Sequence, residues 1–109
     1  MKASLKRKWV KALRSGKYKK GKYQLRRQTE KGDVYCCLGV LCAIEGVKWK
    51  KEKALATVNY GVSGDVGSLT PSRQKQFGID DDAQSKLIVM NYGKGFSFNR
   101  IATWIEKNL

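Results

Sequence analysis

Cationic and aromatic side chains alternate between residues 14 and 27, a pattern typical of a surface that binds phosphate. Phosphate recognition needs cationic donors close together, and nucleobases stack on aromatic or guanidinium faces. Glycines at positions 16 and 21 would let the backbone approach a ligand closely. The sequence therefore predicts a phosphate- or nucleotide-binding segment formed by Arg14, Lys17, Tyr18, Lys20, Lys22, Arg26 and Arg27.

The aromatic residues near this segment have two possible roles. Tyr18 and Tyr23 could each contact a ligand or lie half-buried against the preceding helix, and we expect Tyr23 to be the more buried of the two. Trp49 stands among lysines, so it could stack on a base or fold back over a hairpin. We assign Trp9 to the core, because it shares a helical spacing with other apolar residues.

Residues suited to catalysis or to metal binding are sparse. The chain has no His, which removes Ser-His and Cys-His pairs, and no Walker-type phosphate loop, so we expect no enzyme. Cys36, Cys37 and Cys42 lack a fourth zinc ligand and are expected in the core, with a zinc shared across a dimer as the alternative. The acidic run 80–82 could hold a divalent cation, but it is more typical of a helix start. We predict neither a metal nor a cofactor.

The positive charge is concentrated at the N-terminal end. The chain has 23 Lys and Arg against 9 Asp and Glu, a net charge of +14. Residues 1–31 hold 13 basic residues and one acid, which leaves +12 there and +2 in the remaining 78 residues. Such a field attracts anions at long range, and salt weakens the attraction. A solvated face that only maintains solubility is the alternative.

Length and composition indicate one domain. At 109 residues and 41% hydrophobic content, the chain can bury one modest core. Its longest apolar runs, 38–44 and 87–90, are too short to span a bilayer, and no signal peptide opens it. We therefore expect a single soluble domain over residues 1–109, and exclude a membrane protein, a disulfide-rich toxin and a multi-domain enzyme.

Local signals predict an α+β fold. Ser4 is expected to cap an amphipathic helix that ends at Gly16, and residues 17–22 are expected to form a loop. Residues 23–28 and 34–37 should pair as a β-hairpin, followed by a buried helix over 38–44 that contains Cys42. Residues 55–60 could form a strand, and 61–68 read as a flexible Gly/Ser loop.

The C-terminal part is predicted to be helical. Thr70 followed by Pro71 should start a short helix that ends at Gly78. The acids at 80–82 should start a second helix, which residues 91–95 break. Ser97 should cap a last helix with Phe98, Ile101, Ala102, Ile105 and Leu109 on its inner face.

Several of these segments, in the same order, resemble a family of small tailed-phage accessory proteins. The matching segments are 9–18 (Trp-Val-Lys-Ala-Leu-Arg-Ser-Gly-Lys-Tyr), Leu25 with Arg26, the specific block 35–42 (Tyr-Cys-Cys-Leu-Gly-Val-Leu-Cys), 69–71, 77–78, 87–91 and 95–106. The chain departs from that pattern at Tyr92, where the family often has Asp. The resemblance implies a protein of the host bacterial cytoplasm, a reducing compartment that suits three free cysteines.

Three functions remain open. The leading hypothesis is a non-enzymatic binder of a phosphate-bearing nucleotide, such as a host-defence signalling nucleotide that the phage sequesters. The first alternative is a DNA- or RNA-binding protein that uses the basic N-terminal face. The second is a protein–protein inhibitor of a host defence or nucleic-acid-processing complex. All three hypotheses imply an anionic ligand or a host protein as the partner, and no membrane. A homo-oligomer is compatible with each of them.

Overall fold

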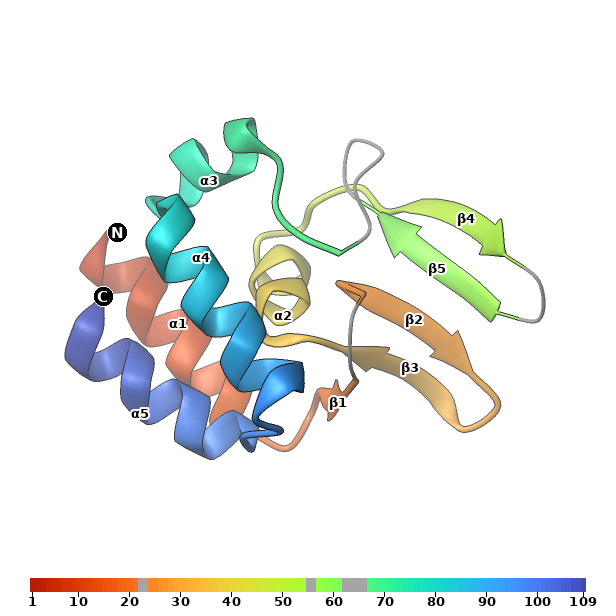
Figure 1. Cartoon of the computed structure of the whole chain (residues 1–109), viewed down its shortest axis with the longest axis horizontal. Helices are drawn as coiled ribbons and strands as arrows, with labels where there is room; N and C mark the ends of the chain where they lie inside the picture. Colours follow the sequence, from red (N-terminus) through yellow and green to blue (C-terminus); the bar gives the residue numbers. More distant parts are fainter. Residues whose placement is uncertain (22–23, 55–56, 62–66) are drawn as a thin grey trace.

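The helices pack together at one end of the molecule, and a twisted sheet forms the other end (Figure 1). The computed structural model describes residues 1–21, 24–54, 57–61 and 67–109. The chain forms a single α+β domain, as its sequence predicts. None of the described helices is long and apolar enough to cross a membrane.

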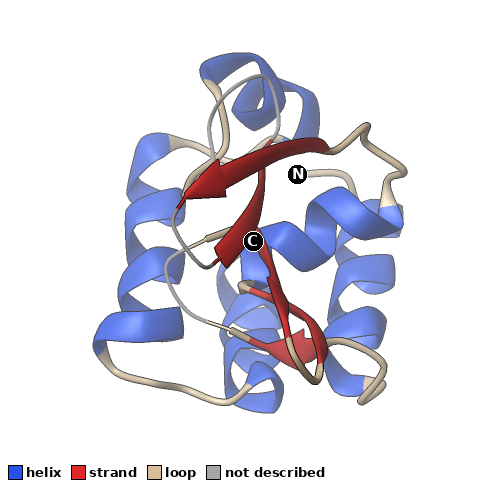
Figure 2. Cartoon of the chain, turned by 90° about the vertical axis from the view of Figure 1, so that its right-hand side faces the viewer, coloured by secondary structure: helices blue, strands red, loops and turns tan. Residues whose placement is uncertain are grey.

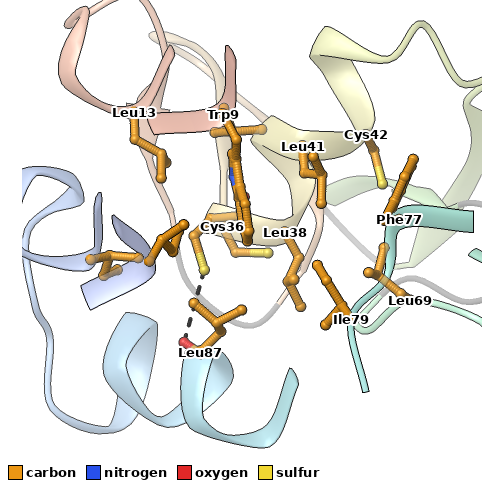
Figure 3. Packing of buried hydrophobic residues seen from close by; sticks show 14 of the residues in the cluster. Trp9, Leu13, Cys36, Leu38, Leu41, Cys42, Leu69, Phe77, Ile79 and Leu87 are labelled. Carbon is orange, nitrogen blue, oxygen red and sulfur yellow. Dashed lines mark hydrogen bonds between the residues drawn. The ribbon is translucent and has the colours of Figure 1, made fainter. Parts of the chain in front are cut away.

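Helix α1 (Ala3–Arg14) is amphipathic and buries one stripe of side chains. Trp9, Val10 and Leu13 point into the core, and Figure 3 shows Trp9 and Leu13 there. The Trp9 indole N–H donates a hydrogen bond to the Cys37 carbonyl at 2.9 Å. The prediction that Ser4 caps this helix is wrong, because Lys2 stands at the N-cap and no side chain caps the helix there. The predicted end is confirmed: Gly16 follows the helix with φ +75.

The sheet combines two hairpins with one short parallel strand. Its order is β1-β3-β2-β5-β4, and Figure 2 shows its strands in front of the helices. The predicted first hairpin is confirmed, with Arg26 opposite Tyr35 in its register. The strands are β1 (Lys19–Lys20), β2 (Arg26–Thr29), β3 (Gly32–Tyr35), β4 (Lys50–Ala54) and β5 (Thr57–Gly61).

Two sheet predictions need correction, and one strand was not predicted. Residues 17–22 were expected to form a loop, but β1 pairs there in parallel with β3, and the Gly21 N–H donates to the Tyr35 carbonyl at 2.7 Å. The second strand ends at Tyr35 rather than at residue 37. The lysine-containing strand β4 was not predicted, because its sequence lacks the alternation of apolar and polar residues that indicates a strand. Of the predicted Gly/Ser loop, residues 62–66 lie outside the described residues.

Helix α2 (Cys37–Ile44) is the buried centre of the molecule, as predicted. The Cys36 sulfur caps it by accepting a hydrogen bond from the Gly39 N–H at 3.4 Å. Gly39 lies against the strand entry so closely that a Cβ there would stand 1.7 Å from the Leu25 carbonyl oxygen. The other side chains of this stretch, Cys37, Leu38, Val40, Leu41 and Cys42, are buried in the hydrophobic cluster, part of which Figure 3 shows.

The remaining helices begin where their capping residues predict. Helix α3 (Pro71–Phe77) is capped by Thr70, α4 (Asp81–Ile88) by Asp80 and α5 (Phe98–Asn108) by Ser97, and each cap oxygen accepts from a backbone N–H three residues later. The predicted break at 91–95 is instead a π-helical turn, η1 (Val89–Gly93), that continues α4. Helix α5 packs beside α1, and this contact forms the main helical interface (Figure 1).

Candidate anion-binding surface

The outward side of α1 is a row of cations. Arg7, Lys11 and Arg14 are exposed and follow one another at intervals of four and three residues, so they share one side of the helix. At 1.5 Å of rise per residue, the row is about 10 Å long. The sequence prediction included only Arg14 of these three. The i, i+4, i+7 spacing was the signal that could have found the other two.

A groove of about 600 Å³ runs along this row where α1 meets α5. Four cations and a single carboxylate border it. Its apolar floor includes Val10, and the stems of the long cationic side chains add further apolar surface. The groove is lined by Lys6, Arg7, Val10, Lys11, Arg14, Ser15 and Glu106.

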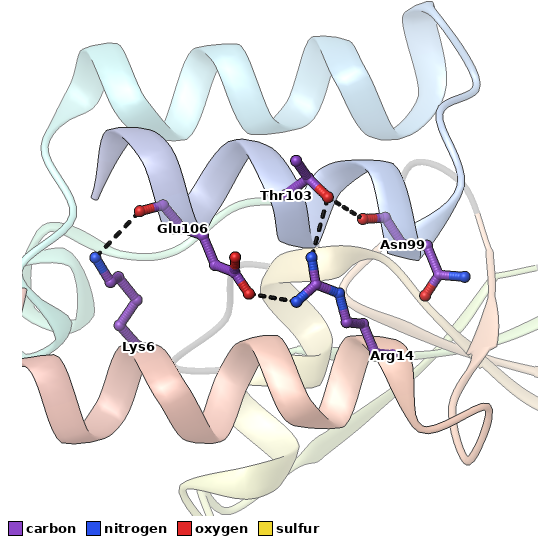
Figure 4. Close-up of polar contacts among 5 residues, drawn as sticks. All are labelled: Lys6, Arg14, Asn99, Thr103 and Glu106. Atoms are coloured by element: carbon purple, nitrogen blue, oxygen red, sulfur yellow. Dashed lines mark hydrogen bonds and ion pairs between the residues drawn. The ribbon is translucent and has the colours of Figure 1, made fainter.

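The single carboxylate of the groove is engaged within the helix pair (Figure 4). Glu106 accepts a hydrogen bond from Arg14, whose guanidinium also donates to Thr103 Oγ1 at 3.0 Å. Lys6 Nζ donates to the Glu106 backbone carbonyl at 3.4 Å. These contacts fix Arg14 and Lys6 against α5. Among the described residues, neither Arg7 nor Lys11 forms an ion pair, so both keep their charge directed to solvent.

A second set of predicted residues lies on the sheet. Tyr18 meets Tyr35 edge to face with ring centroids 5.2 Å apart, and Tyr35 meets Trp49 at 6.4 Å. The Arg26 guanidinium carbon lies 5.6 Å from the Tyr35 ring centroid and 5.4 Å from that of Trp49. Trp49 therefore folds back over the hairpin, one of the two roles left open for it, and Tyr18 is half-buried against the core.

The charge of Arg26 is balanced within this cluster. Its Nε and Nη2 atoms donate to one carboxylate oxygen of Asp33, at 2.9 and 2.5 Å, and both side chains are only 23% exposed. Arg27 points to the other face of β2, as predicted. Its Nε is buried and has no hydrogen-bond partner among the described residues.

Lys20 and Lys17 contact neighbouring groups of the chain. Lys20 is half-buried, and its Nζ donates to the Asn91 carbonyl at 2.7 Å. Lys17 is exposed beside the Tyr18 ring, with its Nζ 5.8 Å from the ring centroid. Lys22 and Tyr23 lie outside the described residues. The predicted site residues are thus divided between the α1 groove and the sheet, and the described residues do not converge on one pocket.

Asn91 is a buried polar residue that sequence reasoning did not identify. It is 1% exposed, its Nδ2 donates to the Gly21 carbonyl at 2.9 Å, and its Oδ1 accepts from the Cys37 N–H at 3.1 Å. It ties η1 to the β1 segment and to the start of α2. Its partners lie 54 and 70 residues away in sequence, so no local pattern could reveal its role.

The cysteines are packed in the core as predicted. All three are free and buried. Burial raises the pKa of Cys36 to about 11 and that of Cys42 to about 12, and it raises the pKa of Cys37 well above its usual value. Neutral thiols are poor nucleophiles and poor metal ligands at neutral pH. The described residues contain no group of three or more His, Cys, Asp or Glu side chains placed to hold a metal.

The acidic run 80–82 begins a helix. The Asp80 carboxylate accepts from the Ala83 N–H at 2.8 Å, Asp81 accepts from Gln74 Nε2 at 2.8 Å, and Asp82 lies 3.0 Å from Lys86 Nζ. Each carboxylate therefore has a structural partner. Negative charge at this end also suits the macrodipole of α4.

The fold and this surface define a small α+β domain with a segregated cationic face. The whole chain, residues 1–109, matches the family model described as a domain of unknown function (DUF8296), and the protein belongs to that family. No curated protein and no solved structure matches the chain.

Proposed function

We propose that this protein is a non-enzymatic binder of nucleic acid that uses the cationic face of α1 to hold the phosphate backbone. The observation that carries the proposal is the exposed row of Arg7, Lys11 and Arg14 beside the groove with α5. A cationic row of about 10 Å matches about three phosphates along one strand of a duplex, at 3.4 Å of axis per phosphate. Exposed cations on a helix suit a long polyanion better than a small ligand.

Nucleotide sequestration, predicted from residues 14–27, is the competing proposal. It needs cations that converge around one ligand. Arg26 is paired with Asp33, and Lys20 contacts a backbone carbonyl. These positions favour the polymer. Inhibition of a host protein by the same basic face is a further proposal, and resemblance to tailed-phage accessory proteins is the reason for proposing the host bacterial cytoplasm as its location.

Binding of labelled duplex DNA and of single-stranded RNA, measured by fluorescence anisotropy over a salt series, tests the proposal. For about three phosphate contacts, the plot of log K against log salt should have a slope of about −2.7 on duplex DNA. The double variant Arg7→Gln/Lys11→Gln should reduce the magnitude of that slope by about 1.8. The matched control Lys31→Gln/Lys75→Gln removes the same charge outside α1, at two exposed positions, and should leave the slope nearly unchanged.

Other outcomes would favour the competing proposal. A flat salt response, or equal effects of the two double variants, would contradict backbone binding through α1. Calorimetric titration with a mononucleotide and with a cyclic dinucleotide provides the comparison. Saturable one-to-one binding that persists in high salt and is abolished by Arg26→Ala would support the nucleotide pocket instead.

A further inference from the structure

A second groove, separate from the cationic one, lies where α4 and η1 meet α5. Its volume is about 430 Å³, within the range of clefts that accept ligand or peptide side chains. It shares no lining residue with the α1 groove. The groove is lined by Ser85, Lys86, Val89, Met90, Lys94, Phe96 and Trp104.

The floor of this groove is apolar and partly open to solvent. Val89 is 48% exposed, although it stands in the middle of a helical segment, and Phe96 and Trp104 are half-buried. The π-helical turn that contains Val89 widens the end of α4, and such turns are frequent at functional sites. Apolar and aromatic side chains left together at a surface are typical of protein interaction sites.

The rim of the groove is cationic. Lys94 Nζ lies 5.8 Å from the Phe96 ring centroid, and the Arg100 guanidinium carbon lies 3.7 Å from the same centroid. Lys86 also borders the groove, with its side chain 59% exposed and its Nζ 3.0 Å from the Asp82 carboxylate. None of the seven lining residues is acidic. An occupant must therefore bring apolar groups to the floor and negative charge to the rim.

We propose that this groove binds an acidic amphipathic helix of a partner protein, with apolar side chains against Val89, Phe96 and Trp104 and carboxylates beside Lys86, Lys94 and Arg100. Helices bind in apolar grooves through such anchors, and charges at the rim select the partner. A second copy of this chain fits poorly, because each copy carries +14 and would bring a cationic rim against a cationic rim.

The test uses the full-length protein labelled with ¹⁵N and a synthetic peptide helix that has Leu on one face and Glu on the other. Titration should shift the Trp104 indole signal and the amide signals of Val89 and Phe96, and leave the indole of buried Trp9 unchanged. Val89→Asp should weaken binding about tenfold, since it places an unpaired carboxylate in an apolar groove beside a peptide of the same charge. The control Ser72→Asp adds the same charge on exposed α3 and should bind the peptide like the natural chain.

Control peptides separate this groove from simple charge attraction. A Glu peptide without Leu, or a Leu peptide with Lys in place of Glu, should bind much more weakly, and equal binding of either would overturn the proposal. Groove signals that shift on concentrating the protein alone would identify a second copy as the occupant and would also overturn it. The Arg7→Gln/Lys11→Gln variant should affect the peptide no more than its charge-matched control does. The peptide and nucleic-acid results can thus fail independently.

Discussion

The buried contact around Asn91 and the exposed outer face of α1 are both polar, but their polar groups have different roles. At Asn91 the side-chain amide has partners from two distant segments, and it is 1% exposed. On α1, Arg7 and Lys11 have no ion-pair partner among the described residues. Polar groups in the first region stabilise the fold, since buried donors and acceptors must be paired. Charges in the second are available to a ligand.

The largest effect is expected where the buried region leaves no space. In Gly39→Ala, the added Cβ would stand 1.7 Å from the Leu25 carbonyl oxygen, so the backbone of one segment must move. We expect the free energy of unfolding to fall by more than about 4 kcal/mol, measured by urea denaturation. In the control Gly93→Ala, the added Cβ would lie 3.6 Å from the Val89 side chain, an ordinary van der Waals contact, so the free energy of unfolding should change little. Similar stabilities for the two variants would show that α2 and the strand entry are not held this tightly.

The next largest effect is expected at Asn91. Asn91→Ala leaves the Cys37 N–H and the Gly21 carbonyl without their partners, which should cost about 2–4 kcal/mol of unfolding free energy. Asn108→Ala removes a hydrogen bond of similar length, 2.9 Å to the Trp104 carbonyl, at an exposed position and should cost less than about 0.5 kcal/mol. Equal losses in the two variants would contradict the difference between buried and exposed polar groups drawn above.

A pH-dependent effect should follow from the buried thiols. Because burial raises the pKa of Cys36 from 9.0 to about 11, its contribution to stability is fully present below pH 9 and is lost as the pH rises toward 11. A shift of two pKa units corresponds to about 2.7 kcal/mol of unfolding free energy. Urea denaturation at pH 8 and at pH 10.5 should show this decrease, and Cys36→Ser should reduce it.

Alkylation gives a direct check on the thiols. Iodoacetamide at pH 8 should leave all three cysteines of the native protein unmodified and should modify them in urea. Modification of a native cysteine at the rate of the unfolded chain would show that this thiol is accessible and ionised.

The smallest change in stability is expected on the exposed face of α1. Arg7→Gln/Lys11→Gln removes two exposed cations without removing a buried contact, so the free energy of unfolding should change by less than about 0.5 kcal/mol per residue. The same variant should lose affinity for DNA. If this double variant strongly destabilises the fold, Arg7 and Lys11 stabilise the structure and are not simply part of a ligand-binding surface.

The sequence predicted those parts of the fold that depend on neighbouring residues. Thr70 and Ser97 cap their helices as expected, because a cap needs only a side-chain oxygen and a backbone N–H three residues away. Asp80 was expected only as negative charge at a helix start, and it caps its helix in the same way. Lysine-containing β4 and the two-residue β1 were not predicted, since a strand without apolar alternation depends on its pairing partners. The predicted Ser4 cap is wrong because α1 starts two residues earlier than such a cap implies, at Ala3, with Lys2 at the N-cap.

The same limit applies to the candidate site: the sequence reveals its charge, but not the contacts of its individual side chains. Segregated charge in residues 1–31 is visible in the sequence, and it located the cationic segment. Arg14 and Arg26 could not be separated on that basis, because their settings depend on Glu106 and Asp33. The prediction concentrated on residues 14–27, whereas the exposed row also includes Arg7 and Lys11.

By itself, the sequence determined the α+β class, the caps at Thr70 and Ser97, the buried cysteine-containing helix and the sign and location of the charge. All of these depend on composition or on spacings within a few residues. Tertiary structure alone decided which cations face solvent, where Trp49 lies and what Asn91 connects. Those outcomes depend on contacts such as Arg14 with Glu106 and Asn91 with Gly21, which join residues 92 and 70 positions apart.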